Sequence, residues 1–231
     1  MDSPFARCNS VIDQVFVGTR QSLPPEGQPT GMYKRPVAGP VDLGREGLAG
    51  DVQADRRVHG GPEKALHHYP AEHYATLTAV FPAAADALVP GSLGENVTTL
   101  GLVEDAVCVG DVFRLGTARI QVSQPRSPCW KIDCKFAATG MARFIAEKGI
   151  TGWYYRVLET GRIGPGDGLE LLDRNVDPVT LSRLWRAQLE RRPALDELQR
   201  LLGTPGLAPG WAKKLADRLD WLRRNPELDF G

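Results

Sequence analysis

Short apolar runs alternate with glycine and proline along the first three quarters of the chain. Several runs are rich in Val, Ile or aromatic residues, which is typical of strands bounded by turns. The predicted strands are Val11–Val17, Lys64–Tyr69, Glu95–Thr99, Val112–Leu115, Ala118–Val122, Trp153–Leu158 and Leu169–Leu172. Two predicted helices interrupt them, Ala71–Val80 ahead of Pro82 and Met141–Lys148 ahead of the capping residue Gly149. Residues 1–173 are therefore expected to form a mainly β domain, a barrel-like or sandwich sheet with inserted helices.

Residues 177–225 have a helical periodicity instead. Apolar residues recur there at spacings of three and four in three stripes: Leu181, Leu184, Trp185 and Leu189; Leu195, Leu198, Leu201 and Leu202; Trp211, Leu215, Leu219 and Leu222. Asp177 and Pro178 fit an N-cap followed by proline at the first helical position. The pattern predicts a small C-terminal unit of three amphipathic helices.

Composition and charge narrow the class of protein. The 28 basic and 28 acidic side chains balance, so no overall field draws nucleic acid or an anionic membrane to the chain. Four scattered cysteines are too few for the disulfide framework of a secreted protein. No signal peptide is recognisable, and no stretch approaches the roughly 20 apolar residues of a membrane span. We expect a soluble, cytoplasmic protein with reduced thiols and with neither a membrane nor a nucleic acid as partner.

The first cluster of candidate chemistry surrounds the Gly-Gly turn at residues 60–61. Arg57, His59, Lys64, His67 and His68 lie beside this turn. The glycines let the backbone approach a ligand closely, and the cations would neutralise an anion such as a phosphate. The alternative is a polar surface loop, but three of the four histidines of the chain fall in this segment, which favours a functional role.

A second cluster lies at a predicted strand entry, where Glu95 and Asn96 follow the turn residue Gly94. A glutamate can act as a general acid or base, and an asparagine can hydrogen-bond the edge of a heterocycle. A strand entry without any further role explains the same residues equally well.

The third cluster is a stiff loop around Cys129. Pro125 and Pro128 restrain the backbone before the cysteine, while Arg126 and Lys131 place cations on either side of it. Nearby cations favour the thiolate, which is the form that acts as a nucleophile or metal ligand. A small buried hydrophobic residue remains the alternative. Cys134 could pair with Cys129, but this spacing is a weak zinc signal without a second pair.

Taken together, the motifs resemble the MOSC domain, which is related to the C-terminal part of molybdenum-cofactor sulfurases. The resemblance rests on the ordered segments GDVQADRRVHGGPEKALHHY, GSLGENVTT, VGDVFRLGTARIQVSQPRSPCWKI and GWYYRVLETGRIGPGD. The helical unit after them is similar to the three-helix extension of the YiiM-type branch. The resemblance covers residues 44–222 and implies a β-barrel-like core that carries molybdopterin, the organic part of the molybdenum cofactor.

Within this resemblance, Cys129 corresponds to the cysteine that ligates molybdenum, and thiolate is a soft donor suited to that metal. Arg57, Lys64 and Arg126 are the candidates for binding the cofactor's phosphate, and Asn96 is a further candidate for cofactor binding. His59 and Glu95 match motif positions on the expected substrate side, where either would be the proton donor.

The resemblance also implies an activity, the reduction of N-hydroxylated compounds such as N-hydroxylaminopurine bases to amines. No dinucleotide-binding fingerprint and no four-cysteine iron–sulfur pattern occurs in the sequence. Electrons are therefore expected from a separate donor protein. A homodimer is an expectation at the level of the family.

Three other functions compete with this hypothesis. One keeps the family but makes the protein a sulfur or cofactor carrier, with a persulfide on Cys129. Another is a zinc hydrolase that uses histidines and a cysteine, although no HExxH or CxxC spacing supports it. The last is DNA binding through the C-terminal helices, where residues 174–231 hold 11 basic and 8 acidic side chains. Because these charges are interleaved, a packing or dimerising appendage is favoured.

Overall fold

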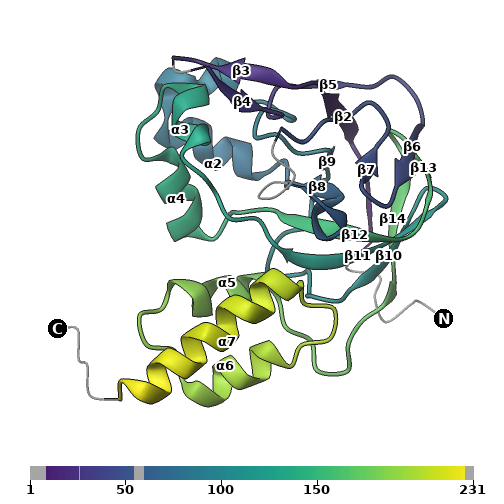
Figure 1. Ribbon diagram of the computed structural model, residues 1–231. Coiled ribbons are helices and arrows are strands. Elements are labelled where there is room, and N and C mark those ends of the chain that lie inside the picture. Colours follow the sequence, from purple (N-terminus) through teal and green to yellow (C-terminus); the bar gives the residue numbers. More distant parts are fainter. Residues whose placement is uncertain (1–8, 26, 55–59, 227–231) are drawn as a thin grey trace.

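The computed structural model describes residues 9–25, 27–54 and 60–226, and a curled sheet forms the centre of this part of the chain (Figure 1). Its strand order is β1 (Ser10–Val11), β14 (Gly168–Asp173), β10 (Val112–Leu115), β11 (Ala118–Pro125), β12 (Trp153–Glu159), β8 (Leu66–His68), β9 (Val97–Thr98), β2 (Gln14–Gly18) and β5 (Lys34–Pro36). All neighbouring strands are antiparallel except β8 and β9. Smaller sheets comprise β13 (Gly161–Ile163), β6 (Val41–Gly44) and β7 (Gly47–Leu48), and β3 (Gln21–Leu23) with β4 (Gln28–Thr30).

The connection between β1 and β2 shows how strongly this sheet curls. β1 lies at one end of the strand order, while β2 is next to last at the other end. Only Ile12 and Asp13 separate these two strands along the chain, so the two ends of the sheet lie close together. This geometry confirms the expected barrel-like β fold with inserted helices. It also corrects the predicted single strand Val11–Val17, because its two halves pair with different partners.

The predicted hairpin strands follow the alternation of the sequence. Phe113 and Leu115 of β10 are fully buried, as are Ile120 and Val122 of β11. Gly116 provides the positive φ of the tight turn, so that Leu115 pairs with Ala118. The burial of alternate side chains thus fixes the orientation of β11 in the sheet. The end of β11 leads directly into the Cys129 loop.

Helices cover one side of the sheet through a separate apolar core (Figure 1). They are α2 (His73–Val80), the 3-10 helix η3 (Pro82–Ala87), α3 (Lys131–Phe136) and α4 (Met141–Lys148). The 3-10 helix η2 (Pro62–Lys64) packs against β11 and β12 instead. Leu77 of α2, Ile132 of α3 and Ile145 of α4 are fully buried in that core. Gly149 caps α4 in the left-handed conformation, as predicted.

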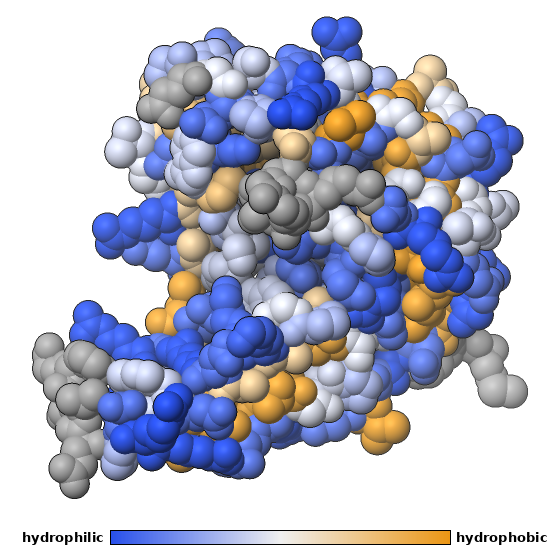
Figure 2. Space-filling model, in the orientation of Figure 1, coloured by the Kyte–Doolittle hydropathy of each residue, from blue (hydrophilic) through white to orange (hydrophobic). Residues whose placement is uncertain are grey.

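The C-terminal unit consists of α5 (Leu181–Leu189), α6 (Leu195–Leu202) and α7 (Pro209–Arg224). Most residues of its apolar stripes face inward, but Leu189 and Leu195, which were predicted in these stripes, are exposed. The outer face of the unit is mainly hydrophilic (Figure 2). The predicted N-cap at Asp177 is wrong, because Thr180 is extended and its hydroxyl accepts the hydrogen bond from the Arg183 amide at 3.1 Å. Among the described residues, no helix has the length and apolar character that crossing a bilayer requires.

Candidate functional site

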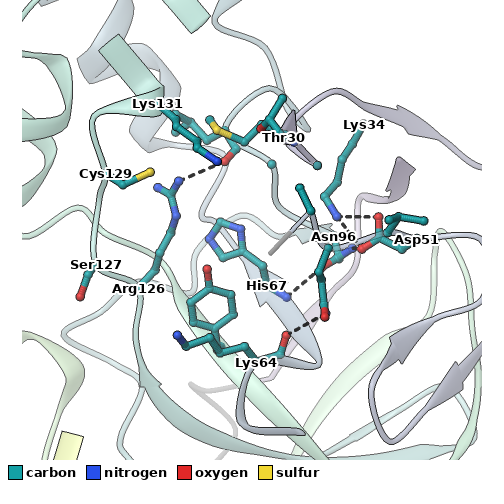
Figure 3. Close-up of a pocket in the computed structure, with 18 residues that line it drawn as sticks. Thr30, Lys34, Asp51, Lys64, His67, Asn96, Arg126, Ser127, Cys129 and Lys131 are labelled. Atoms are coloured by element: carbon teal, nitrogen blue, oxygen red, sulfur yellow. Dashed lines mark hydrogen bonds and ion pairs between the residues drawn. The ribbon is translucent and has the colours of Figure 1, made fainter. Parts of the chain in front are cut away.

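A pocket enclosing about 660 Å³ of space, part of it open to solvent, lies between the curled sheet and α3 (Figure 3). The close-up shows Cys129 and Arg126 on one side and Lys34, Asp51 and Asn96 on the other. The His67 ring lies between the two groups. The structure therefore brings together residues from segments that are far apart in the sequence.

The Cys129 loop connects the end of β11 to α3. The amide of Arg126 donates to the carbonyl of Gly152 at 3.0 Å, which fastens the start of the loop to β12's entry. The carbonyl of Cys129 accepts from the Ile132 amide at 3.0 Å, which fastens its end to α3. Cys129 is a free, partly exposed cysteine on the pocket wall. Cys134 is also free but does not line the pocket, and Cys108 is buried.

Arg126 places a largely buried cation beside Cys129, with 5% of the residue exposed. Its Nη2 donates to the Leu93 carbonyl at 3.3 Å, whereas its Nη1 is buried without a hydrogen-bond partner. A guanidinium carries only donors, so Nη1 requires an acceptor. The sequence-predicted neighbours Arg126 and Cys129 thus share one pocket.

The adjacent histidines His67 and His68 have opposite environments because side chains alternate across β8. His67 pairs with Tyr154 of β12, and both line the pocket with ring centroids 5.0 Å apart. Burial and the charge of Arg126 lower the pKa of His67 well below its ordinary value. His68 faces the core, where Tyr155 and Thr99 satisfy its ring nitrogens and burial lowers its pKa to about 3. Burial therefore disfavours the charged form of both histidines.

A buried network holds the opposite wall. The Nζ of Lys34 lies 2.6 and 2.7 Å from the two carboxylate oxygens of Asp51. The Asp51 carboxylate also accepts from the Gly18 amide and from Asn96 Nδ2, each at 2.8 Å. Asn96 Nδ2 makes a second bond to the Phe16 carbonyl at 3.2 Å, so both of its amide hydrogens are used.

Glu95 lies behind the pocket and is not among its lining residues. Its Oε1 accepts from the Tyr74 hydroxyl at 2.5 Å and from the Gly91 amide at 2.6 Å. Burial raises the pKa of Glu95, and its Oε2 has no hydrogen-bond partner. The structure thus separates Glu95 from Asn96, its neighbour in the sequence, because consecutive residues point in opposite directions.

Of the remaining predicted site residues, Lys64 lines the pocket from the end of η2. Its Nζ lies 6.0 Å from the centroid of the Tyr154 ring. Arg57 and His59 lie outside the described residues. Glu63 pairs with Arg156 of β12 and Ser123 Oγ donates to the Glu63 carbonyl at 2.6 Å, so η2 is bound to the sheet beneath it.

Two lysines of α3 hold the segment that forms another part of the pocket wall. Lys131 Nζ donates to the Pro29 carbonyl at 2.8 Å, and Lys135 Nζ donates to the Met32 carbonyl at 2.8 Å and to the Ser92 carbonyl. Burial lowers the pKa of Lys135 to about 8. Lys131, predicted as a charge beside the thiol, therefore also has a structural role.

Sequence analysis missed Lys34, Asp51 and Tyr154 as site residues. Asp51 opens the first quoted motif, and its acidic character in a basic segment was the available signal. For the aromatic segment at residues 152–156 the sequence left a pocket lining and the core as alternatives, with the core favoured; Trp153 and Tyr155 are fully buried, but Tyr154 faces the pocket. In the part of the chain that the structure describes, no three His, Cys, Asp or Glu side chains group as a metal-binding set. The described residues thus lend no support to a zinc hydrolase.

Comparisons with known proteins agree with this architecture. The MOSC domain matches residues 55–170, and the YiiM-like 3-alpha helix domain matches residues 179–220. The chain is 40% identical over 208 residues to protein YiiM of Escherichia coli strain K12, covering 88% of this chain and 90% of that protein. It is 34% identical over 168 residues to a protein named reductase from Gibberella moniliformis, covering 72% of this chain and 30% of that protein.

Structural similarity extends over both parts of the fold. The crystal structure of YiiM from Geobacillus stearothermophilus matches with a TM-score of 0.77 at 32% identity, covering 91% of this chain and 99% of that chain. The curled sheet and the three terminal helices therefore belong to one common architecture. The chain belongs to the MOSC-domain family and is of the YiiM type.

Proposed function

We propose that this protein is a molybdenum-cofactor oxidoreductase that reduces N-hydroxylated compounds, such as N-hydroxylaminopurine bases, to amines. The observation that carries the proposal is the Cys129 thiol in one pocket with Arg126, whose Nη1 is buried without a partner. An unsatisfied buried donor costs about 1–3 kcal/mol, so a bound acceptor would relieve it. Membership of the MOSC family and a relative named reductase support the same function.

The charges of the pocket suit an anionic cofactor. Its described lining residues include four cations, Lys34, Lys64, Arg126 and Lys131, against the carboxylate of Asp51, which Lys34 already pairs with. Molybdopterin ends in a phosphate, which cationic donors bind well. Lys64 and Arg126 are the proposed phosphate ligands, together with Arg57, and Cys129 is the proposed metal ligand.

Asn96 contributes to cofactor binding by positioning. Both hydrogens of its Nδ2 are already donated to Phe16 and Asp51. Its side chain therefore orders the wall around His67 and Asp51, and that ordered wall is the surface presented to the cofactor.

When bound, the cofactor supplies the two-electron chemistry by which R–NHOH, two electrons and two protons become R–NH2 and water. The chain supplies the soft sulfur ligand at Cys129, the cations that anchor the phosphate, and the protons. His59 and Glu95 are the proposed proton donors, and a separate donor protein provides the electrons. Because burial raises the pKa of Glu95, this carboxyl retains a proton more readily than an exposed glutamate.

The deciding experiment is elemental analysis of protein purified from a host that makes molybdopterin. Wild type should contain molybdenum and reduce N-hydroxylaminopurine with reduced viologen, whereas Cys129→Ala should lose the metal, the activity or both. Cys134→Ala is the matched control, because this free cysteine lies outside the pocket lining, and it should behave as wild type. A wild type without molybdenum, or a fully active Cys129→Ala, would disprove the proposal.

The two proton donors can be examined separately. Replacing His59 or Glu95 with glutamine keeps a hydrogen-bonding side chain but removes its titration. At least one replacement should lower turnover with an artificial reductant and change its pH dependence. If both variants retain the wild-type rate and pH profile, neither residue is the donor.

The partial exposure of Cys129 favours a second candidate, a sulfur carrier that holds a persulfide on this thiol. Such a carrier would accept sulfur from a donor and pass it on without reducing any N-hydroxylated base. Mass spectrometry after incubation with a sulfur donor distinguishes the two: a carrier gains one sulfur atom at Cys129 and shows no turnover with viologen.

A further inference from the structure

Two side chains that line the pocket each carry a buried atom without a hydrogen-bond partner. Nine buried side-chain nitrogen or oxygen atoms among the described residues have no hydrogen-bond partner. Only His67 Nε2 and Arg126 Nη1 among these nine belong to residues that line the pocket. Both residues are at least nine-tenths buried, with 4% and 5% of their surface exposed. Buried polar groups in proteins are nearly always paired, so these two point to a ligand.

Gly152 lies between the backbone of Arg126 and the imidazole of His67. Its carbonyl accepts from the Arg126 amide at 3.0 Å, and a Cβ placed on it would lie 3.4 Å from His67 Nε2. Arg126 also lowers the pKa of His67 by its charge. In Figure 3 the guanidinium of Arg126 lies between Cys129 and the His67 ring. A small group beside the Cys129 sulfur would therefore be within reach of both residues.

The chemistry of the pair specifies an acceptor. A guanidinium offers only N–H donors, and a neutral imidazole offers one donor and one acceptor. A single ligand atom that satisfies both residues must accept from Arg126, and it must accept from or donate to His67 Nε2 according to which ring nitrogen carries the proton. Oxygen with two lone pairs meets this requirement, whereas the nitrogen of an aromatic amine does not.

We propose that His67 and Arg126 bind the hydroxyl oxygen of the N-hydroxylated substrate beside Cys129, and so select that oxygen over the parent amine. The inference rests on the proposed function; it assigns Arg126 Nη1 to this oxygen and leaves the other N–H groups of the guanidinium for the cofactor's phosphate. When two electrons and two protons cleave the N–O bond, this oxygen leaves as water. The positive guanidinium would stabilise negative charge that develops on the departing oxygen.

His67 acts in this arrangement as a neutral imidazole. Because burial and Arg126 hold its pKa well below the ordinary range, it keeps one N–H throughout the neutral range of pH. His67 thus contributes geometry and a hydrogen bond, and the protons come from elsewhere.

The test measures binding to the oxidised holoenzyme, in which no turnover occurs. The two ligands are 6-N-hydroxylaminopurine and adenine, which differ by one oxygen. Wild type should bind the hydroxylamine more tightly. In His67→Phe the ratio of the two affinities should fall by up to about tenfold, which is the upper end of the effect of one neutral hydrogen bond.

His67→Gln provides the conservative comparison, because its amide restores a donor. His67→Gln should recover part of the preference for the hydroxylamine. If His67→Phe does not fold, the comparison is made between wild type and His67→Gln. An unchanged affinity ratio in both variants would overturn the proposal. So would a loss of molybdenum content with no change in the ratio, because His67 would then contact the cofactor.

Failure of the proposed function has a different signature. Wild type itself would then contain no molybdenum or would not reduce the hydroxylamine, whatever the His67 variants do. If wild type is loaded and active but both His67 variants keep the full preference, only the assignment of the oxygen contact is wrong.

Discussion

Asn96 holds both backbone groups of His67. The Oδ1 of Asn96 accepts from the His67 amide at 3.0 Å, and the Asn96 amide donates to the His67 carbonyl at 2.8 Å. The same asparagine bonds Asp51, which Lys34 neutralises. The imidazole is therefore attached to a backbone position that a buried polar network fixes from one side. Such a network leaves the ring little freedom to turn away from the pocket.

Asn96→Ala should destabilise the protein by about 2–4 kcal/mol, because it removes several buried hydrogen bonds and leaves their partners unsatisfied. Urea denaturation measures the loss. The control is Asn175→Ala, because Asn175 also donates to two carbonyls but lies in a partly exposed position. It should cost about 1 kcal/mol or less.

The positioning role of Asn96 has a readout of its own. In Asn96→Ala that is still folded, the preference for hydroxylamine over adenine should weaken although His67 is intact. Equal preferences in the variant and in wild type would limit Asn96 to a structural role.

The stability of the protein should rise with pH through the titration of Lys135. Burial lowers its native pKa to about 8, with Glu95 opposing and Arg126 and Lys34 adding to the shift, against 10.5 for an ordinary lysine. Between these values the unfolded chain holds a proton that the native state has released. The unfolding free energy therefore rises with pH there, by at most about 1.4 kcal/mol per pH unit.

This slope can be isolated by urea denaturation between pH 7 and pH 10. The difference in unfolding free energy between wild type and Lys135→Met should be smallest near neutral pH and grow above the native pKa. Lys148→Met, at an exposed position in the last turn of α4, should give a constant difference. A constant difference for Lys135→Met as well would contradict the shift.

Gly152→Ala should be strongly destabilising. Gly152 has a φ of 67°, and an added Cβ would lie 2.4 Å from the His68 carbonyl oxygen. Gly166 has a φ of 85° but open space around its Cα, so Gly166→Ala incurs only the backbone strain, about 1–2 kcal/mol. Overpacking should lower the unfolding free energy of Gly152→Ala by a further amount of about 1–3 kcal/mol, compared with Gly166→Ala, as measured by thermal or urea unfolding. Equal losses would show that the backbone shifts freely there.

The start of α5 can be tested with two alanine substitutions. Thr180→Ala removes the hydroxyl that caps the helix and should cost about 1 kcal/mol of unfolding free energy. Asp177→Ala removes only an exposed ion pair with Arg200 and should change stability by less than about 0.5 kcal/mol. A larger loss of unfolding free energy in Asp177→Ala than in Thr180→Ala would instead support Asp177 as the N-cap, as the sequence suggested.

The sequence predicted those elements whose own pattern is strong. β10 and α4 occur within the expected bounds, and β11, β12 and β14 were found with small differences at their ends. The short strands between Gln21 and Leu48 were missed, since two to four residues are too few to display an alternation. Their positions depend on pairing with distant segments, as for β6, which pairs with β13.

The site was predictable only as far as its motifs are local. Cys129 and Arg126 belong to one rigid loop, so their association follows from the sequence. His67 and His68 are chemically identical neighbours, and only the phase of β8 within the sheet decides which one faces the pocket. Lys34 reaches the pocket through the pairing of β5 with β2, a tertiary relationship that no local pattern contains.

The apolar core beneath β10 and β11 continues without a break into α5, α6 and α7. Phe113 and Ile120 of the sheet belong to the same cluster of buried residues as Leu184 and Leu215 of the helices. Deleting the helices would expose this shared surface to water and invite aggregation. Calorimetric melting of the whole chain is accordingly expected as a single cooperative peak, with the curled sheet and the three helices unfolding at one temperature.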